Sequence, residues 1–178
     1  MNDNAELSSR YLAAFDKLTE DFVTTFSRYD AARFNAPRAE GAWSPGQLVE
    51  HLLRSEKGIL ALIGGLAAPP APGRRPDDKC AAIDGEGFRE TRERFEAPER
   101  LRPTAERYAP AETLDRFVDR RADLRVAFEF SDDVGAVVES YVHFVFGEMT
   151  RLEWFYFAAA HGERHRRQFQ RSALAAGR

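Results

Sequence analysis

Apolar residues in the first part of the chain recur at steps of three and four, which is the helical period rather than the strand period of two. They are Leu7, Tyr11, Leu12, Phe15, Leu18, Phe22 and Phe26. This pattern predicts a first helix over residues 5–29. The segment 28–41 that follows is polar and contains Pro37 and Gly41, so we expect a connection there.

A second helix has a well-marked start. Ser44 suits the N-cap, Pro45 suits the first helical position, and Gln47 completes a capping box with Ser44. One broad apolar face follows, made of Leu48, Leu52, Ile59, Leu62 and Ile63. Gly64 and Gly65 then end the pattern, which predicts a helix over residues 45–63.

The last third of the chain predicts two further helices. A third, over residues 111–130, is indicated by apolar positions at helical spacing, namely Leu114, Phe117, Val118, Leu124 and Phe128. A turn over residues 134–147 separates it from a fourth helix over residues 150–172, which Thr150 and Glu153 begin with a capping box. We interpret the aromatic residues 154–157 as core packing rather than as a cofactor site.

A long connection over residues 67–110 joins the second and third helices and holds seven of the nine prolines. A loop of this length is functional, or crosses from one end of a bundle to the other, or is partly disordered. A crossover lets consecutive helices lie parallel, and residues 87–96 are compatible with a short helix inside it. With no repeat and no sustained strand alternation, we expect an all-α four-helix bundle, one domain over residues 1–178.

Composition and charge narrow the class of protein. The hydrophobic fraction of 43% and the charged fraction of 31% are typical of a soluble globular chain. The net charge of −3 does not favour nucleic acid as a partner. The amino terminus is polar and no apolar run reaches the roughly 20 residues of a membrane span, so we expect a cytoplasmic protein without a membrane partner. The single cysteine, Cys80, is interpreted as a solvated thiol without a role.

Candidate chemistry lies in the few histidines. His161 and His165 are four residues apart and share one helical face, so their side chains can converge on one ion, or they can lie on a solvated terminal turn among arginines. His51 lies on the inward face of the second helix, where the alternative is a core histidine satisfied by a carbonyl or a hydroxyl. Together the three would form a His₃ set with open coordination positions, which is typical of a catalytic metal site. On the fourth helix, one stripe carries Trp154, Ala158, His161, His165 and Gln168.

Two segments, residues 43–52 (WSPGQLVEHL) and 161–168 (HGERHRRQ), resemble the two motifs of the DinB-like superfamily. The similarity extends between them, because residues 100–103 are similar to the segment before the third helix of that family. Residues 143–147 resemble the His-Pro-x-x-Gly turn before its fourth helix, although Phe144 replaces the proline. The resemblance covers roughly residues 5–172.

The resemblance implies a four-helix bundle of down-up-up-down type, often a homodimer, with a divalent ion bound by three histidines. Those ligands correspond to His51, His161 and His165, whereas His143 has no ligand role in the family pattern and is interpreted as structural. Zinc, nickel and iron all suit imidazole ligands.

Relatives in this family include thiol-dependent transferases and isomerases, and others are regarded as hydrolases. The first hypothesis is therefore a metal-dependent S-transferase that uses a low-molecular-weight thiol and acts on an electrophilic small molecule. A metal-dependent hydrolase is the alternative, in which Glu50 or Glu163 is either the base or a solvated surface charge. A non-enzymatic stress-response or structural metal-binding protein is the third.

Overall fold

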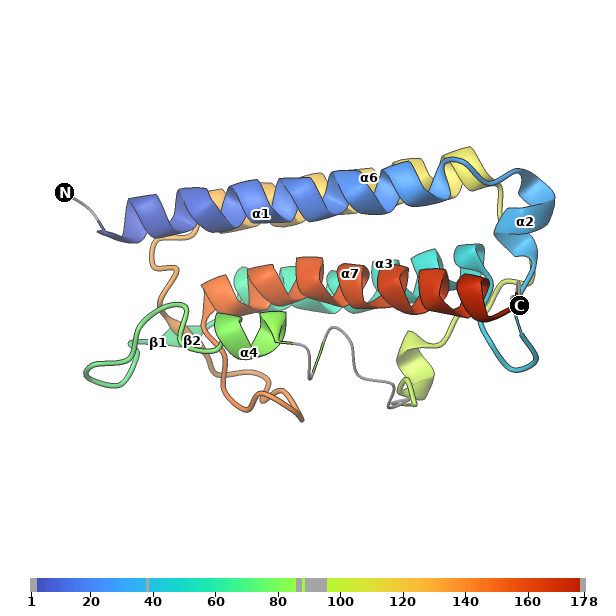
Figure 1. Ribbon diagram of the computed structural model, residues 1–178. Helices are drawn as coiled ribbons and strands as arrows, with labels where there is room; N and C mark the ends of the chain where they lie inside the picture. Colours follow the sequence, from blue (N-terminus) through green and yellow to red (C-terminus); the bar gives the residue numbers. More distant parts are fainter. Residues whose placement is uncertain (1–2, 38, 86–87, 89–95, 177–178) are drawn as a thin grey trace.

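Four long helices make up most of the computed structural model, which describes residues 3–37, 39–85, 88 and 96–176 (Figure 1). They are α1 (Asp3–Phe26), α3 (Pro45–Ile63), α6 (Pro110–Glu129) and α7 (Arg151–Ala176). The predicted second helix is confirmed at both ends, and the other three are confirmed to within about one turn. No helix in the described ranges has the length and apolar character that a membrane span requires.

The direction of the helices confirms the down-up-up-down bundle. Figure 1 shows α1 and α7 running one way and α3 and α6 running the other. The two parallel helices α3 and α6 are joined by a long crossover (residues 64–109), which returns the chain from the end of α3 to the other end of the bundle. The crossover therefore has the role that its length predicted.

Two apolar clusters fill the interior. In the first, the ring of Phe155 stacks between Phe15 and Phe128, with ring centroids 4.3 and 4.2 Å apart. The second is built around Phe22, Phe26, Phe34, Phe117 and Phe169. Residues 152–160 of α7 are all buried and belong mostly to the first cluster, whereas Phe169 belongs to the second. The part of α7 between them, residues 161–168, therefore lies at the junction of the two clusters.

Some details of the predicted helices were wrong. Val118 is 43% exposed, so the buried face of α6 does not include it. The predicted polar connection over residues 28–41 contains a short helix, α2 (Ala31–Asn35), in which the side chain of Asp30 caps the helix and Phe34 is fully buried. Its five residues are too few to display a helical period.

The crossover also contains structure that its composition did not indicate. It includes β1 (Ala67–Ala68), α4 (Cys80–Asp84) and the 3₁₀ turn η1 (Glu99–Leu101). The strand β1 pairs antiparallel with β2 (Val137–Val138), with Ala67 opposite Val138. The short helix expected over residues 87–96 lies outside the described residues except at its Phe88 and Glu96 positions.

One buried carboxylate, Glu153, joins the crossover to the start of α7. The predicted capping box is confirmed, since Glu153 N donates to Thr150 Oγ1 at 3.1 Å and Thr150 N donates to Glu153 Oε2 at 2.8 Å. The same carboxylate accepts from Arg74 Nη2 at 2.9 Å and from Lys79 N at 2.8 Å. Glu153 thus satisfies donors from two segments that are distant in sequence.

Replacing Glu153 with Ala should lower the free energy of unfolding by about 3 kcal/mol, because Arg74 and two amides would lose their buried acceptor. Urea denaturation measures the change. Glu129→Ala, which removes an exposed ion pair with Arg125, is the control and should change stability by less than about 1 kcal/mol. Equal effects of the two substitutions would contradict the assigned role of Glu153.

Candidate metal centre

The side chain of His51 is placed by the first two turns of α3. The capping box predicted at Ser44 and Gln47 is present, so the start of the helix is well defined. Leu48 and Leu52 are buried on either side of His51, and His51 itself is only 4% exposed. The inward orientation expected from the apolar face is therefore confirmed.

The other two histidines come from α7 and meet His51 at their Nε2 atoms. His51 Nε2 lies 3.4 Å from His161 Nε2, and His165 Nε2 lies 3.0 Å from His161 Nε2. All three candidate ligand atoms lie within 4.8 Å of one another. His161 and His165 are half-buried. The alternative that both lie on a solvated terminal turn was therefore wrong.

The spacing of these nitrogens fits a single transition-metal ion. A tetrahedral ion with bonds of about 2.0–2.1 Å places its ligand nitrogens about 3.3 Å apart. The two separations that involve His161, 3.0 and 3.4 Å, bracket that value. Three imidazoles leave at least one coordination position for a further ligand.

The surroundings keep the imidazoles neutral, which is the form that binds metal. Burial is the largest cause that lowers the pKa of each of the three histidines. For His161 and His165, repulsion by neighbouring histidines and by Arg164 acts in the same direction, and the pKa of His165 is lowered to about 3. Neutral rings present a lone pair on one nitrogen at pH 7.

Contacts outside the cluster orient two of the rings. His51 Nδ1 lies 2.9 Å from the carbonyl oxygen of Leu101. A carbonyl only accepts, so Nδ1 carries the proton and Nε2 keeps its lone pair toward the cluster. The side chain of Gln168 forms a hydrogen bond with His165. His161 Nδ1 is buried and has no hydrogen-bond partner among the described residues.

Aromatic rings enclose the cluster on two sides. The ring of Phe157 stacks on His161 at 5.4 Å between centroids with an interplanar angle of 12°. Trp43, which precedes the cap of α3, lies 4.8 Å from the ring of His51. These contacts restrict the rotation of the two imidazoles and exclude water from their faces.

The family model described as the DinB superfamily matches residues 14–169 of this chain. The chain belongs to the DinB superfamily. Its fold is similar to a solved structure described as "YfiT from Bacillus subtilis is a probable metal-dependent hydrolase with an unusual four-helix bundle topology". The TM-score is 0.60 at 11% sequence identity, and the likeness covers 99% of this chain and 90% of that one. A search among curated proteins found no match.

Membership of the DinB superfamily and the three converging histidines together indicate a metal-dependent function. The same two observations support a divalent metal ion as the cofactor. The likeness to YfiT, at 11% identity, supports the fold alone.

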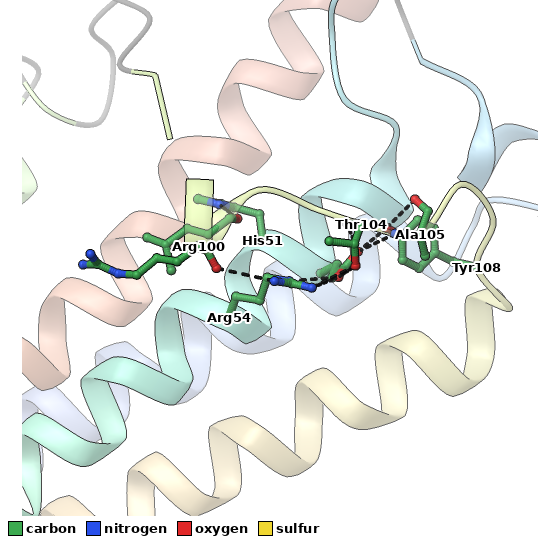
Figure 2. A network of polar contacts seen from close by, with 8 residues as sticks. His51, Arg54, Arg100, Thr104, Ala105 and Tyr108 are labelled. Carbon is green, nitrogen blue, oxygen red and sulfur yellow. Dashed lines mark hydrogen bonds and ion pairs between the residues drawn. The ribbon is translucent and has the colours of Figure 1, made fainter. Parts of the chain in front are cut away.

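Glu50, the residue before His51, is engaged in hydrogen bonds, so the expectation of a solvated surface charge was wrong. Its carboxylate accepts from the amides of Thr104 and Ala105 at 2.9 and 3.3 Å, from the Tyr108 hydroxyl, and from Arg54 Nε at 2.9 Å. Figure 2 shows these four partners, Arg54, Thr104, Ala105 and Tyr108, in one polar network. Burial acts to raise the pKa of Glu50, but these hydrogen bonds outweigh it and lower the pKa to about 2. Glu50 therefore holds the end of the crossover beside the histidine cluster.

Glu163, between the two histidines of α7, is also fully engaged. Its side chain is 1% exposed, so the expected solvated charge was wrong. The carboxylate accepts from Arg166 Nε and Nη2 at 2.7 and 2.8 Å and from Arg167 Nε at 2.6 Å. Burial raises its pKa, and the hydrogen bonds from both arginines more than reverse that effect. It is a local ion pair of the helix rather than an available base.

His143 lies outside the cluster, as the resemblance implied. It is 5% exposed, and its Nδ1 accepts from the amides of Val145 and Phe146 at 3.1 and 3.2 Å. The amide of His143 donates to the carbonyl of Gly147 at 2.9 Å, and Gly147 donates in return at 2.7 Å. This turn forms with Phe144 in place of proline, and Phe144 is 72% exposed.

Cys80 is buried, with 2% of its surface exposed, so the prediction of a solvated thiol was wrong. Burial raises the pKa of its thiol to about 12, which leaves it protonated and unreactive at neutral pH. It lies at the start of α4 and packs in the first apolar cluster.

Sequence reasoning missed three residues behind the cluster. Glu56 and Arg121 form a buried ion pair, and Gly162 lies against Arg121. The sequence did indicate that each residue needs a buried partner, since Glu56 falls among the apolar positions of the second predicted helix and Arg121 among those of the third, but it did not pair them. A charged residue on an apolar stripe requires a buried partner.

The depressed pKa of Glu50 predicts a stability that depends on pH. Ionised Glu50 stabilises the fold fully above its unfolded-state pKa of about 4.3, and this stabilisation is lost as the pH falls toward about 2. Metal-free wild type should therefore be more stable than Glu50→Gln at pH 7, and the difference should shrink by more than half at pH 3. Urea denaturation across this range provides the measurement. A difference that stays constant down to pH 3 would contradict the assignment.

Proposed function

We propose that His51, His161 and His165 bind one divalent transition-metal ion through Nε2 and that the protein is a metal-dependent enzyme. The observation that carries the proposal is the convergence of three neutral imidazoles at separations of 3.0 and 3.4 Å. A bound ion would lower the pKa of a water or thiol at its open side and so supply a nucleophile at neutral pH.

Transfer of a low-molecular-weight thiol to an electrophilic small molecule is the reaction that the side chains support best. Within the described chain the candidate ligand group contains histidines alone, and both neighbouring glutamates are held by arginines. No carboxylate of the motif is thus free to act as a base. A thiol, with a pKa of about 8.5, ionises at a lower pH than water does and so depends less on a base. This favours sulfur as the nucleophile.

The transfer step is balanced without an external oxidant or reductant. The thiol sulfur forms a bond to the electrophilic carbon, and the leaving group departs with the electron pair of the broken bond. The thiol proton passes to solvent. His51, His161 and His165 would hold the ion, and the ion would supply the open position at which a thiol ionises.

Metal-dependent hydrolysis is the second candidate. A bound ion would activate a coordinated water for this reaction, and YfiT, which shares the fold, is described as a probable metal-dependent hydrolase. A role of the ion in stability alone, in a non-enzymatic protein, is the third. Zinc, nickel and iron all suit a three-imidazole site, and elemental analysis of protein purified without a histidine tag identifies which one is bound.

The test compares two assays on the same metal-loaded protein. Thiol transfer is followed with a bimane electrophile and bacillithiol, mycothiol or cysteine, and hydrolysis is followed with nitrophenyl esters. We expect thiol-dependent turnover that His161→Ala abolishes, together with at least about a tenfold loss of metal affinity in that variant. Ester hydrolysis without thiol transfer would support the second candidate, and inactivity in both assays would contradict an enzyme of either type.

Removal of the metal separates catalysis from a structural role. An open site predicts that chelation abolishes turnover and lowers the melting temperature by only a few degrees. Unfolding on chelation, in a protein that shows no turnover when loaded, would support the structural role instead.

A homodimer and a cytoplasmic location stay predictions. For the dimer we propose the exposed side of α6 and its C-cap residue Phe130, where Val118, Val126 and Phe130 are 43, 50 and 82% exposed. Light scattering coupled to gel filtration should give twice the chain mass for wild type and the single-chain mass for Val126→Glu. A monomeric wild type would contradict this proposal.

A further inference from the structure

Behind the histidine cluster, α3 and α6 are joined by a fully buried ion pair. Arg121 donates to both oxygens of Glu56, from Nη2 at 2.7 Å and from Nε at 3.1 Å. The side chains of Arg121 and Glu56 are 3 and 0% exposed. Such a two-bond arrangement fixes direction as well as distance between its partners.

The same guanidinium also reaches α7. Arg121 Nη2 donates to the carbonyl oxygen of Ala158 at 3.0 Å, in the helical turn that precedes His161. The guanidinium lies over the rings of Phe15 and Phe117, 4.9 and 4.8 Å from their centroids. Arg121 thus contacts all three of the other long helices.

Gly162, the residue after His161, provides the room for this contact. A Cβ atom at Gly162 would lie 2.8 Å from Arg121 Nη2 and 3.9 Å from Leu52 Cδ1. The first distance is shorter than side chains tolerate, so any larger residue would displace Arg121 or α7. The glycine between the two histidines therefore allows close packing of α7 against Arg121 and α3.

Both ends of this network lie close to the histidines in sequence. Glu56 follows His51 by five residues on α3, and Gly162 directly follows His161 on α7. The separation of His51 Nε2 from His161 Nε2 depends on the height and rotation of α7 relative to α3. A contact that joins one carbonyl of α7 to one carboxylate of α3 restricts both quantities.

We propose that Glu56 and Arg121 are positioning residues of the metal centre, which hold α3 and α7 where the three imidazoles can share one ion. This inference rests on the proposed metal site. Stability alone does not account for the pair, because well-packed apolar side chains of similar size commonly replace a buried ion pair without loss of stability. Apolar contacts are non-directional, whereas the hydrogen bonds of Arg121 are directional.

The first experiment compares two glycine substitutions by Co(II) affinity and by the visible spectrum of bound Co(II). Gly162→Ala should weaken Co(II) binding by about 10- to 100-fold and alter the spectrum, because the added methyl group displaces Arg121. Gly58→Ala is the matched control, since a Cβ at Gly58 meets nothing within 4 Å. It should leave the affinity and the spectrum unchanged and raise the melting temperature slightly.

The second experiment removes the pair while keeping its volume. The double variant Glu56→Met/Arg121→Met should keep the wild-type melting temperature within a few degrees without metal, and should bind Co(II) about 10- to 100-fold more weakly. If it fails to fold, Arg121→Lys replaces it, because lysine keeps the charge but cannot bond both Glu56 oxygens and Ala158 in this geometry. That variant should also show an altered Co(II) spectrum.

The outcomes separate this inference from the function on which it rests. Wild-type affinity and spectrum in Gly162→Ala and in the folded pair variant would overturn the positioning role alone. Failure of the wild-type protein to bind Co(II) would overturn the proposed metal site, and the positioning role with it.

Discussion

The position of α7 against α3 is the constraint on which the rest of the structure depends. Three imidazole nitrogens can share a site only if α7 has one particular position along α3 and one particular rotation about its own axis. The buried stretch 152–160 of α7 brings that helix into the core. Apolar packing alone leaves the helix free to slide or turn by small amounts, because it is non-directional. Hydrogen bonds and ion pairs with defined geometry restrict these movements, because they are directional.

The crossover belongs to the site as much as the helices do. It lets α3 and α6 run parallel, and its two ends are held by different carboxylates. Glu153 binds its first half at the start of α7, and Glu50 binds residues 104–108 beside the histidines. The carbonyl of Leu101 in the same segment sets the tautomer of His51. A stretch that its prolines mark as irregular thus orients a candidate ligand.

The features that could be predicted from the sequence depend on residues that are close together in the chain. The capping boxes at Ser44 and Thr150 involve neighbours in the chain, so helix starts could be recognised directly. The spacing of His161 and His165 on one helical face brought these two together on the same basis. The apolar face of the second helix indicated an inward His51, and the family motifs then supported the set of three. These features depend on residues within about one helical turn.

The features that sequence reasoning missed depend on contacts across the fold. Glu50 and Glu163 have similar settings in sequence, but one binds the crossover and the other binds arginines of its own helix. Cys80 lies among prolines and charges, yet the first apolar cluster covers it. The pairing of Glu56 with Arg121 joins residues 65 positions apart, and no local pattern identifies such a partner.

X-ray absorption at the metal edge, on protein purified without a tag and loaded with one equivalent of zinc, tests the central claim most directly. The account predicts one ion per chain with three imidazole nitrogens at about 2.0–2.1 Å and at least one exchangeable oxygen ligand. It also predicts that His51→Ala reduces the imidazole count to two. A shell of oxygen ligands only, or an imidazole count that His51→Ala leaves unchanged, would contradict it.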